Sequence, residues 1–434
     1  MKSISVEENL SRVTQLITDK QYAAAADLCT ALIAQSPQNA TAHYLAGLAC
    51  YLSNRPERAV DYFRQAVFLN SADKNALYNL GVVCGELHRN DEAISAYRAL
   101  IEQAPRHTKA YQNMALLLVK TGKYTESVAT LKQVLDADPA DILTAGLLLE
   151  IECQWLPMPA RILSCNDILR RAELTDEIRY TGLIYRAMAE WIIEDDQALA
   201  GTLAMALRHK PSTLTTGVRN IGIFETFLTR LLEYRHVDPA LYVTNKKTLC
   251  MVGDSHSLSY AGANIRFEGD DYKINSHIIV GTKSWHIGTA PPNSRAQALA
   301  AYMARLPVGS TFFCVFGEID CRLDNGILPA WQKYGGALEA LVDTQVSAYV
   351  RAVTASAALR SLRPVFVSVP APHRASGDRR HVVTLYNAAL ARHARQSGHR
   401  YFDLYTPTLG ADGFSDESLY LDKFHLKPHV ISGK

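Results

Sequence analysis

The sequence lacks long apolar runs and carries little net charge. No uninterrupted apolar stretch among the 434 residues approaches the roughly 20 residues that a membrane-spanning helix needs. Polar residues begin at Lys2, so the N-terminal segment does not resemble a secretory signal. The formal net charge of +2 gives no indication of a nucleic-acid or membrane surface. We therefore expect no membrane span and no nucleic-acid partner.

Paired cysteines and metal-ligand spacings are also missing. The eight cysteines include no Cys-x-x-Cys pair, and most lie in apolar surroundings that are typical of reduced core thiols. His425 and His429 have the spacing of helical metal ligands, but Pro428 interrupts a continuous helix between them. No glycine-rich phosphate loop follows an expected strand. The sequence predicts a cytoplasmic protein without metal or cofactor.

What the chain does contain is a period of 34 residues in its first third. Pro37, Pro105 and Pro139 fall on one register of this period, and Gly47 and Gly81 fall on another. The small residues allow two helices to approach closely, and the prolines end every second helix. Further positions follow the same period: Ala25, Ala59, Ala93 and Ser127, and the large residues Phe63, Tyr97 and Leu131. Such a repeat indicates stacked pairs of antiparallel helices.

The segment Ala76-Leu77-Tyr78-Asn79-Leu80-Gly81, with Ala93, Tyr97 and Pro105, resembles a tetratricopeptide repeat (TPR). About four such repeats fill residues 6–141, which predicts an all-α TPR solenoid with a concave groove. The resemblance implies a protein or peptide partner in that groove. Asn79 and Asn113 stand one period apart; they either reach into the groove to bind peptide backbone or tie one helix to the next.

Residues 142–244 keep apolar residues at helical spacing but lose the period. We expect this region either to cap the solenoid and pack onto the C-terminal module or to hold degenerate repeats, and the residues indicate no chemistry in it. From residue 245 to 434 the pattern changes to short apolar runs alternating with helical stretches. The expected strands lie at 248–252, 278–280, 311–316, 364–369 and 401–404. Alternation of this kind predicts a five-stranded parallel sheet covered by helices, a three-layer α/β/α domain of flavodoxin-like type.

Gly253-Asp254-Ser255 follows the first expected strand, and Asp422 precedes His425 by three residues near the end of the chain. A strand that leads into a tight turn places a serine hydroxyl at the sheet edge where α/β folds carry their chemistry. A histidine with a neighbouring aspartate supplies a base and the group that orients it.

These segments, with Gly281 after the second strand and Gly317-Glu318-Ile319-Asp320 after the third, resemble the SGNH (GDSL-type) hydrolases. The resemblance spans residues 248–425. It implies Ser255 as nucleophile, His425 as base and Asp422 as its orienting partner. It also implies that the backbone N–H groups of Ser255 and Gly281 donate to the oxyanion.

The sequence departs from that family at one position. The third block usually reads Gly-x-Asn-Asp, and Ile319 stands where the asparagine would donate to the oxyanion. Losing one such donor typically costs about 100- to 1000-fold in rate. Arg322 is a candidate substitute that would suit an anionic substrate, or it forms a salt bridge with Glu318 or Asp320. His256 is the other candidate, or a structural residue at the start of the next helix.

Other residues of this module have two interpretations each. Trp285 either lines a pocket in which a sugar stacks or packs as a loop aromatic. Asp254 either contributes to the site or caps the following helix. Asp320 is assigned to the oxyanion and substrate region with Gly281 and Arg322. Four basic residues are expected in a solvated loop: Arg374, Arg379, Arg380 and His381.

The sequence thus predicts a serine-dependent esterase or acyltransferase that acts on small O-acyl groups, chiefly O-acetyl on a carbohydrate or glycoconjugate. The TPR array would recruit its partner or substrate. The alternative is an inactive module of the same fold in a TPR adaptor, with Asp422 and His425 as a surface pair.

Overall fold

The computed structural model describes residues 5–139, 141–155, 158–170, 174–213, 216–242, 247–290, 292–372, 377–422 and 425–432. It divides into two compact units, Met1–Leu148 and Leu149–Lys434, which we describe separately. Within the described residues, no helix is long and apolar enough to span a bilayer. The expected domain limits at 141 and 244 stay predictions, and residues 243–246 lie outside the described part.

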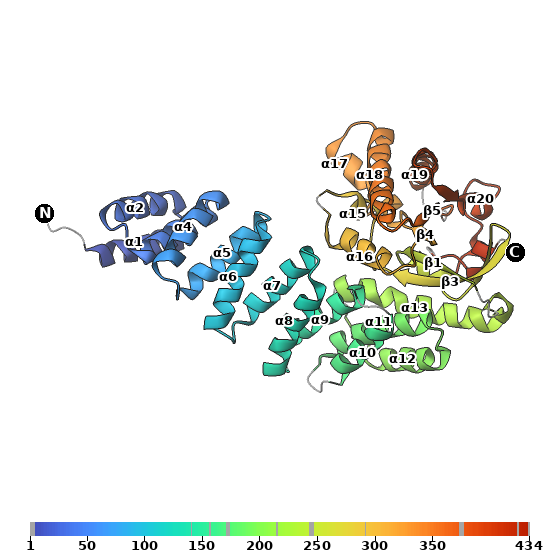
Figure 1. Ribbon diagram of the computed structural model, residues 1–434, viewed down its shortest axis with the longest axis horizontal. Helices are drawn as coiled ribbons and strands as arrows, with labels where there is room; N and C mark the ends of the chain where they lie inside the picture. The colour runs from blue at the N-terminus through green and yellow to red at the C-terminus, as the bar shows by residue number, and fades with distance from the viewer. Residues whose placement is uncertain are drawn as a thin grey trace. The chain divides into compact units, whose positions relative to one another are not determined.

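The first unit consists of antiparallel helix pairs (Figure 1). In chain order these are α1 (Val6–Thr18), α2 (Tyr22–Gln35), α3 (Ala40–Leu52), α4 (Pro56–Leu69), α5 (Lys74–Glu86), α6 (Asn90–Gln103), α7 (Thr108–Lys120) and α8 (Tyr124–Ala137), followed by α9 (Ile142–Trp155), which crosses into the second unit. Each second helix ends two residues before the 34-residue proline register. The side chains of Asn39 and Asp73 then cap the helices that follow. The predicted all-helical TPR array is confirmed.

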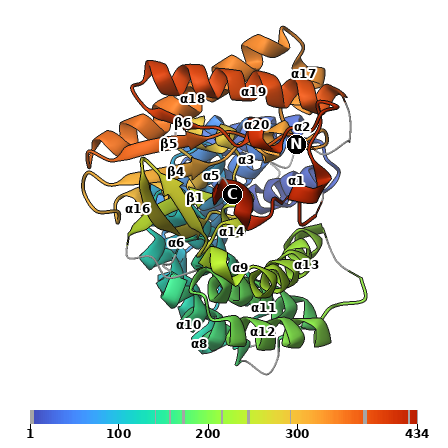
Figure 2. The ribbon, with the colours of Figure 1, turned by 90° about the vertical axis from the view of Figure 1, so that its right-hand side faces the viewer.

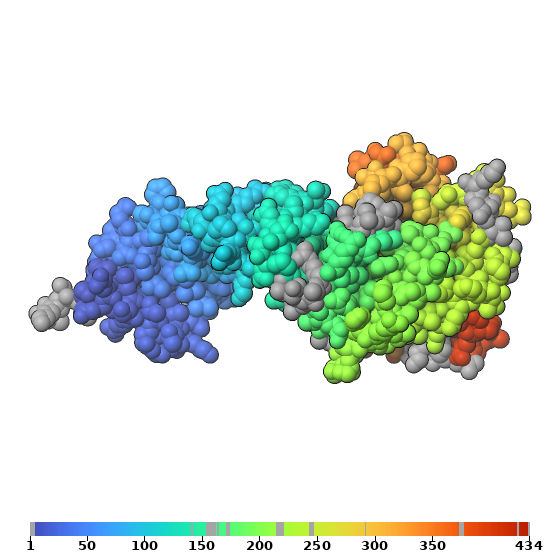
Figure 3. All heavy atoms as spheres, turned by 90° about the horizontal axis from the view of Figure 1, so that it is seen from below, coloured from blue at the N-terminus to red at the C-terminus, as the bar shows by residue number. Residues whose placement is uncertain are grey.

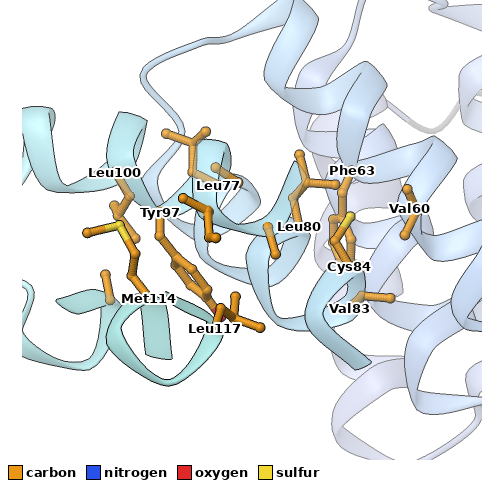
Figure 4. Close-up of a cluster of buried hydrophobic side chains, with 14 of the residues drawn as sticks. Val60, Phe63, Leu77, Leu80, Val83, Cys84, Tyr97, Leu100, Met114 and Leu117 are labelled. Atoms are coloured by element: carbon orange, nitrogen blue, oxygen red, sulfur yellow. The ribbon is translucent and has the colours of Figure 1, made fainter. Parts of the chain in front are cut away.

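Small and large residues of the repeat fit together as the period predicts. A Cβ atom built on Gly81 would lie 2.7 Å from the ring of Tyr97, and one on Gly47 would lie 2.7 Å from the ring of Phe63. Both rings are buried, and they occupy the core between successive helix pairs (Figure 4). Glycine is therefore required at these positions because the aromatic ring occupies the space of a side chain.

The second unit begins with helices that were expected only as a connection. After α9 they are α10 (Met158–Leu169), α11 (Asp176–Ile192), α12 (Asp196–Arg208) and α13 (Thr216–Val237), then the short helix η1 (Pro239–Tyr242). On the face seen in Figure 3, α11 to α13 (green) adjoin the first strands of the sheet (yellow-green). The indole N–H of Trp191 donates to the carbonyl of Leu258 at 2.7 Å, so α11 is bonded to the α/β part.

The sheet has six strands, in the order β2-β3-β1-β4-β5-β6. They are β1 (Thr248–Gly253), β2 (Asn264–Phe267), β3 (Asp270–Ile278), β4 (Thr311–Val315), β5 (Arg363–Val367) and β6 (Arg400–Phe402). Four of the expected strands lie close to their expected positions, whereas the strand expected at 278–280 is β3, which ends at Ile278. These five strands are mutually parallel, and β2 adds an antiparallel edge beside β3, so the sheet is mixed. The prediction of a five-stranded parallel sheet was wrong in this respect. β2 and the first residues of β3 form an edge hairpin, but they are largely polar and lack the apolar pattern by which a strand is recognised in a sequence.

Helices cover both faces of this sheet (Figure 2). The long helices α18 (Leu338–Ala358) and α19 (Gly377–Gln396) pack on one face, and α11 and α13 lie on the other side. The helix after β1, α14 (His256–Ser259), has only four residues. Helices from before the sheet therefore cover surface that a longer α14 would cover. The remaining short helices are α15 (Ser284–Gly288), α16 (Ser294–Met303), α17 (Ile327–Tyr334), α20 (Tyr405–Thr408), η2 (Ile319–Cys321), η3 (Glu417–Leu419) and η4 (Pro428–Ser432).

Candidate active site

Ser255 lies at the carboxyl end of β1, in a turn that neighbouring groups hold firmly. A Cβ on Gly253 would lie 2.4 Å from the carbonyl oxygen of Val315, so only glycine lets β1 and β4 come this close. The hydroxyl of Ser257 donates to the carbonyl of Asp254 at 2.8 Å, and Ser276 donates to the carbonyl of Ser257 at 2.7 Å. Ser255 is 8% exposed. The serine is thus presented on a rigid, nearly closed edge of the sheet.

His425 and Asp422 form the pair that the sequence predicts. The imidazole Nδ1 lies 3.0 and 2.9 Å from the two carboxylate oxygens, and the backbone N–H of His425 donates to the same carboxylate at 2.8 Å. Burial lowers the pKa of His425, and the bond with Asp422 opposes this shift only in part. With Nδ1–H donating to Asp422, the neutral ring has an acceptor at Nε2. That atom is buried and has no hydrogen-bond partner in the described part of the chain.

The segment of His425 meets the turn of Ser255. The rings of His425 and His256 have centroids 5.1 Å apart, although about 170 positions separate them in the chain. No hydrogen bond joins the described side chains of Ser255 and His425. Catalytic hydrogen bonds are often long in ligand-free sites and shorten when substrate binds. The Asp422–His425 pair is formed, and it adjoins the segment that contains Ser255 through the ring of His256.

Asp254 and His256 make a second carboxylate–imidazole pair in the same place. One oxygen of Asp254 accepts from the backbone N–H of His256 at 3.0 Å and lies 3.2 Å from its Nδ1. Both residues are buried. Asp254 therefore caps the start of α14, which is one of its two interpretations, and it holds the His256 ring next to His425.

Glu318 is the centre of a buried ionic cluster, of which the sequence indicated only the contact with Arg322. One of its oxygens accepts from Nε and Nη2 of Arg322 at 2.9 and 2.6 Å, and the other accepts from Nη2 of Arg379 at 2.6 Å. Burial raises the pKa of Glu318, but Arg322, His256 and Arg379 together outweigh burial and hold that pKa below its ordinary value. The cluster keeps an ionised carboxylate next to His256.

The placement of Arg379 corrects an expectation. Arg379, Arg380 and His381 were expected in a loop but lie in the first turns of α19. Arg379 is 7% exposed, whereas Arg380 and His381 are exposed as expected. Arg374 lies outside the described residues. Arg322 forms the salt bridge with Glu318 that was one of its two interpretations. No pattern in the sequence distinguishes Arg379 from its basic neighbours, because its partner is 61 positions away.

The carboxylate of Asp320 is bonded to a neighbouring segment and is not left open to a ligand. Its carboxylate accepts from the backbone N–H groups of Ser284 and Trp285 at 2.7 and 3.2 Å, and from the amide of Gln345 at 2.5 Å. Burial raises the pKa of Asp320 to about 6 against these bonds. Asp320 thereby fixes the segment after Gly281, whose φ of +64° suits glycine. These contacts do not favour the expectation that Asp320 faces the oxyanion or the substrate.

Trp285 is the second residue of α15, not a loop residue as one interpretation had it, and its side chain is 52% exposed, so the indole is available to a ligand. Ile319 is buried, and as an apolar side chain it donates no hydrogen bond. Within the residues that the structure describes, no three His, Cys, Asp or Glu side chains gather as metal ligands.

In the first unit, the two asparagines bond to neighbouring helices. The amide of Asn79 donates to the hydroxyl of Tyr44 at 3.4 Å. The amide of Asn113 donates to the hydroxyls of Tyr78 and Tyr97 at 3.4 and 3.2 Å. These contacts are the inter-helix ties that the sequence allowed as one interpretation. Both side chains are half-buried, so a role in peptide binding stays a prediction.

Two family models match the N-terminal helix repeats of the chain. The family model for "Tetratricopeptide repeat" matches residues 86–151, and that for "Anaphase-promoting complex, cyclosome, subunit 3" matches residues 18–100. The chain is 30% identical over 81 residues to a peroxisomal targeting signal receptor of Candida glabrata, spanning 19% of this chain and 14% of that protein. It is 26% identical over 104 residues to the photosystem I assembly protein Ycf3 of Prochlorococcus marinus, spanning 23% of this chain and 60% of that protein. The chain thus spans less than two thirds of either relative.

Two solved structures are similar to part of the chain. YrrB, a TPR protein with an unusual peptide-binding site, has 17% identity and a TM-score of 0.34 over 39% of this chain and 84% of its own. A tetratricopeptide repeat protein from Parabacteroides merdae has 15% identity and a TM-score of 0.35 over 56% of this chain and 94% of its own. The N-terminal part of the chain is a TPR array, a fold suited to an adaptor that binds other proteins.

Proposed function

We propose that residues 248–432 form an SGNH-type serine esterase or acyltransferase, and that the TPR array brings it to its partner or substrate. The observation that carries the proposal is the buried Asp422–His425 pair, which lies against the Ser255 turn with an Nε2 unpartnered among the described groups. The parallel strands follow the order β3-β1-β4-β5-β6, as in doubly wound, flavodoxin-like sheets. In such sheets ligands bind where the strand order reverses, here between β1 and β4. Ser255 and Glu318 follow these two strands.

The proposed reaction uses the residues in the following roles. His425 Nε2 accepts the proton of the Ser255 hydroxyl, whose oxygen attacks the acyl carbon, and Asp422 holds the imidazole in the required tautomer. The backbone N–H groups of Ser255 and Gly281 donate to the oxyanion. His425 then gives this proton to the alcohol oxygen as the acyl–oxygen bond of the substrate breaks, which leaves an acyl-enzyme and a free alcohol. Water or a sugar hydroxyl attacks the acyl-enzyme, His425 takes its proton, and the proton returns to the Ser255 oxygen as the acyl group leaves. The low pKa of His425 supports this role, because the base is neutral at pH 7.

The substrate class is a small O-acyl group, chiefly O-acetyl, on a carbohydrate or glycoconjugate. The exposed indole of Trp285 supports it, since the apolar face of a sugar ring packs well on an aromatic ring. The partner of the TPR array is a protein or peptide. The similarity to a targeting signal receptor over 81 residues is consistent with recognition of a peptide segment.

A second candidate is a non-catalytic adaptor. Ile319 stands where the family has an asparagine donor, and Asp320 is fully used in holding its loop. No hydrogen bond joins the described side chains of Ser255 and His425. These observations favour a module that has kept the fold and lost the reaction.

Labelling with a fluorophosphonate separates the two candidates. The wild-type chain is expected to take up label and to release acetate from p-nitrophenyl acetate and acetylated sugars, and Ser255→Ala is expected to do neither. Ser259→Ala is the matched control, because Ser259 lies in α14, is buried, and has a hydroxyl without a partner among the described groups. An unlabelled wild type, or equal labelling of Ser255→Ala, would reject the enzyme in favour of the adaptor.

A further inference from the structure

Helix α13 presents one row of side chains to the segment that carries His425. The phenyl ring of Phe227 stacks on the imidazole of His425 with centroids 3.8 Å apart and planes 18° apart. Three residues further on, Arg230 Nη1 donates to the carbonyl of Leu421 at 2.5 Å. The hydroxyl of Tyr234 lies 2.6 Å from Nδ1 of His429. Residues 227, 230 and 234 share one face of a helix, so α13 contacts this segment before, at and after the base.

The surroundings of His425 are polar on some sides and apolar on the side of α13. Three titratable groups face the ring: Asp422 on its own segment, His256 on α14, and Glu318 after β4. The ring of His425 also contacts Phe227 of α13, whose side chain is fully buried. The phenyl ring therefore excludes water from one face of the imidazole and restricts its tilt, while Asp422 fixes the edge at Nδ1.

We infer that α13 is a positioning element of the proposed esterase, in which Phe227 orients the His425 base and Arg230 and Tyr234 hold the segment on either side of it. This inference rests on the proposed function. It corrects the expectation that the helical region 142–244 carries no chemistry. The region contributes a packing surface for the base, from a part of the chain some 190 positions away.

The sign of the expected pH effect follows from the largest cause of the shift. Burial is the main reason that the pKa of His425 is lowered, so a variant that admits water beside the ring raises that pKa. Phe227→Ala opens the stacked face and is expected to raise the pKa, moving the acid limb of the rate profile to higher pH. Phe227→Leu keeps an apolar neighbour but loses the flat ring. It is expected to lower kcat with a smaller pKa change.

The experiment uses the full chain with ¹³C-labelled histidine, titrated by NMR, with the His425 signal assigned by its loss in His425→Gln. Hydrolysis of p-nitrophenyl acetate is measured in parallel from pH 4 to 9 (about the working range of His). Phe227→Ala is expected to lower kcat about 100-fold, the typical cost of a misplaced catalytic group. Ile223→Ala is the control, because Ile223 is 45% exposed on the same helix. An unchanged His425 pKa in folded Phe227→Ala would overturn the inference.

Two further variants keep the inference testable if Phe227→Ala does not fold. Arg230→Met and Tyr234→Phe each remove one bond to the segment from exposed or half-buried positions. Each is expected to accelerate hydrogen exchange in residues 419–430, and exchange at the wild-type rate in both would overturn the inference. The titration and exchange readouts need no turnover. If the proposed esterase function is wrong, the wild-type chain will neither take up fluorophosphonate nor hydrolyse the ester. That result does not depend on the titration of His425, so the two failures can be told apart.

Discussion

Substitution of Glu318 by glutamine tests whether the buried ionic cluster holds the candidate site together. Glutamine keeps the shape of the side chain but removes the charge that two guanidinium groups share. The side chain of Arg379 is 8% exposed, so the variant would remove the charge of Glu318 from a buried cation. Breaking such a pair typically costs about 3–5 kcal/mol. Arg322 is 26% exposed and remains hydrated, so its share is below about 1 kcal/mol. We expect a loss of about 3–4 kcal/mol in the free energy of unfolding.

Urea unfolding followed by tryptophan fluorescence measures this loss in the second unit. All four tryptophans lie after residue 148, so their emission reports on that unit alone. Asp343→Asn is the matched control, since Asp343 also pairs with two cationic side chains, Arg392 and His393, but is 43% exposed. Its expected loss is below about 1 kcal/mol. Equal losses in the two variants would refute the argument that burial makes the Glu318 cluster strong.

The same variant carries a pH signature. The pKa of Glu318 is lower in the folded chain than its ordinary value of 4.5, because the arginines outweigh the effect of burial. A carboxyl group of this kind stabilises the fold above its unfolded pKa and loses that contribution as pH falls through the folded pKa. The wild type should therefore lose stability below about pH 4.5 more steeply than Glu318→Gln. Parallel acid limbs in the two proteins would show that Glu318 is not the titrating group.

Two more outcomes are expected. Gly81→Ala should destabilise the TPR array by about 1–3 kcal/mol relative to Gly85→Ala on the same helix. A Cβ atom at position 81 would lie 2.7 Å from the ring of Tyr97, whereas one at position 85 would meet only the side chain of Leu117, at 3.4 Å. Circular dichroism with hydrogen exchange of α5 and α6 checks this, and equal stability would contradict the fit of ring to glycine. Ile319→Asn should raise esterase turnover by up to about 100-fold if the missing oxyanion donor limits the rate; an unchanged rate on p-nitrophenyl acetate would mean that another group already donates there.

The TPR array could be predicted because its information is local and repeated. Gly81 and Tyr97 are 16 positions apart, and the same pair recurs one period earlier as Gly47 and Phe63. Strands β1, β4 and β5 were found for a similar reason, since each consists largely of buried residues. Strand β3 was expected only at its end, because its first four residues are exposed or half-buried. The edge strand β2 was missed because only one of its four residues is buried. An edge strand is specified by its pairing partner more than by its own composition.

The candidate site was predictable only where its residues are neighbours in the sequence. Asp422 and His425 are three positions apart and act on each other directly, so their pairing could be inferred from spacing. Arg379 and Phe227 reach the same place from helices far away in the chain, and each looks there like an ordinary basic or apolar helical residue. Phe227 contributes burial beside the imidazole of His425, and Arg379 contributes charge beside Glu318; both contributions depend on which elements pack together. The surroundings of these two side chains therefore depend on α13 and α19 as well as on the segments that carry them, and such contacts between distant segments are not visible in a sequence motif.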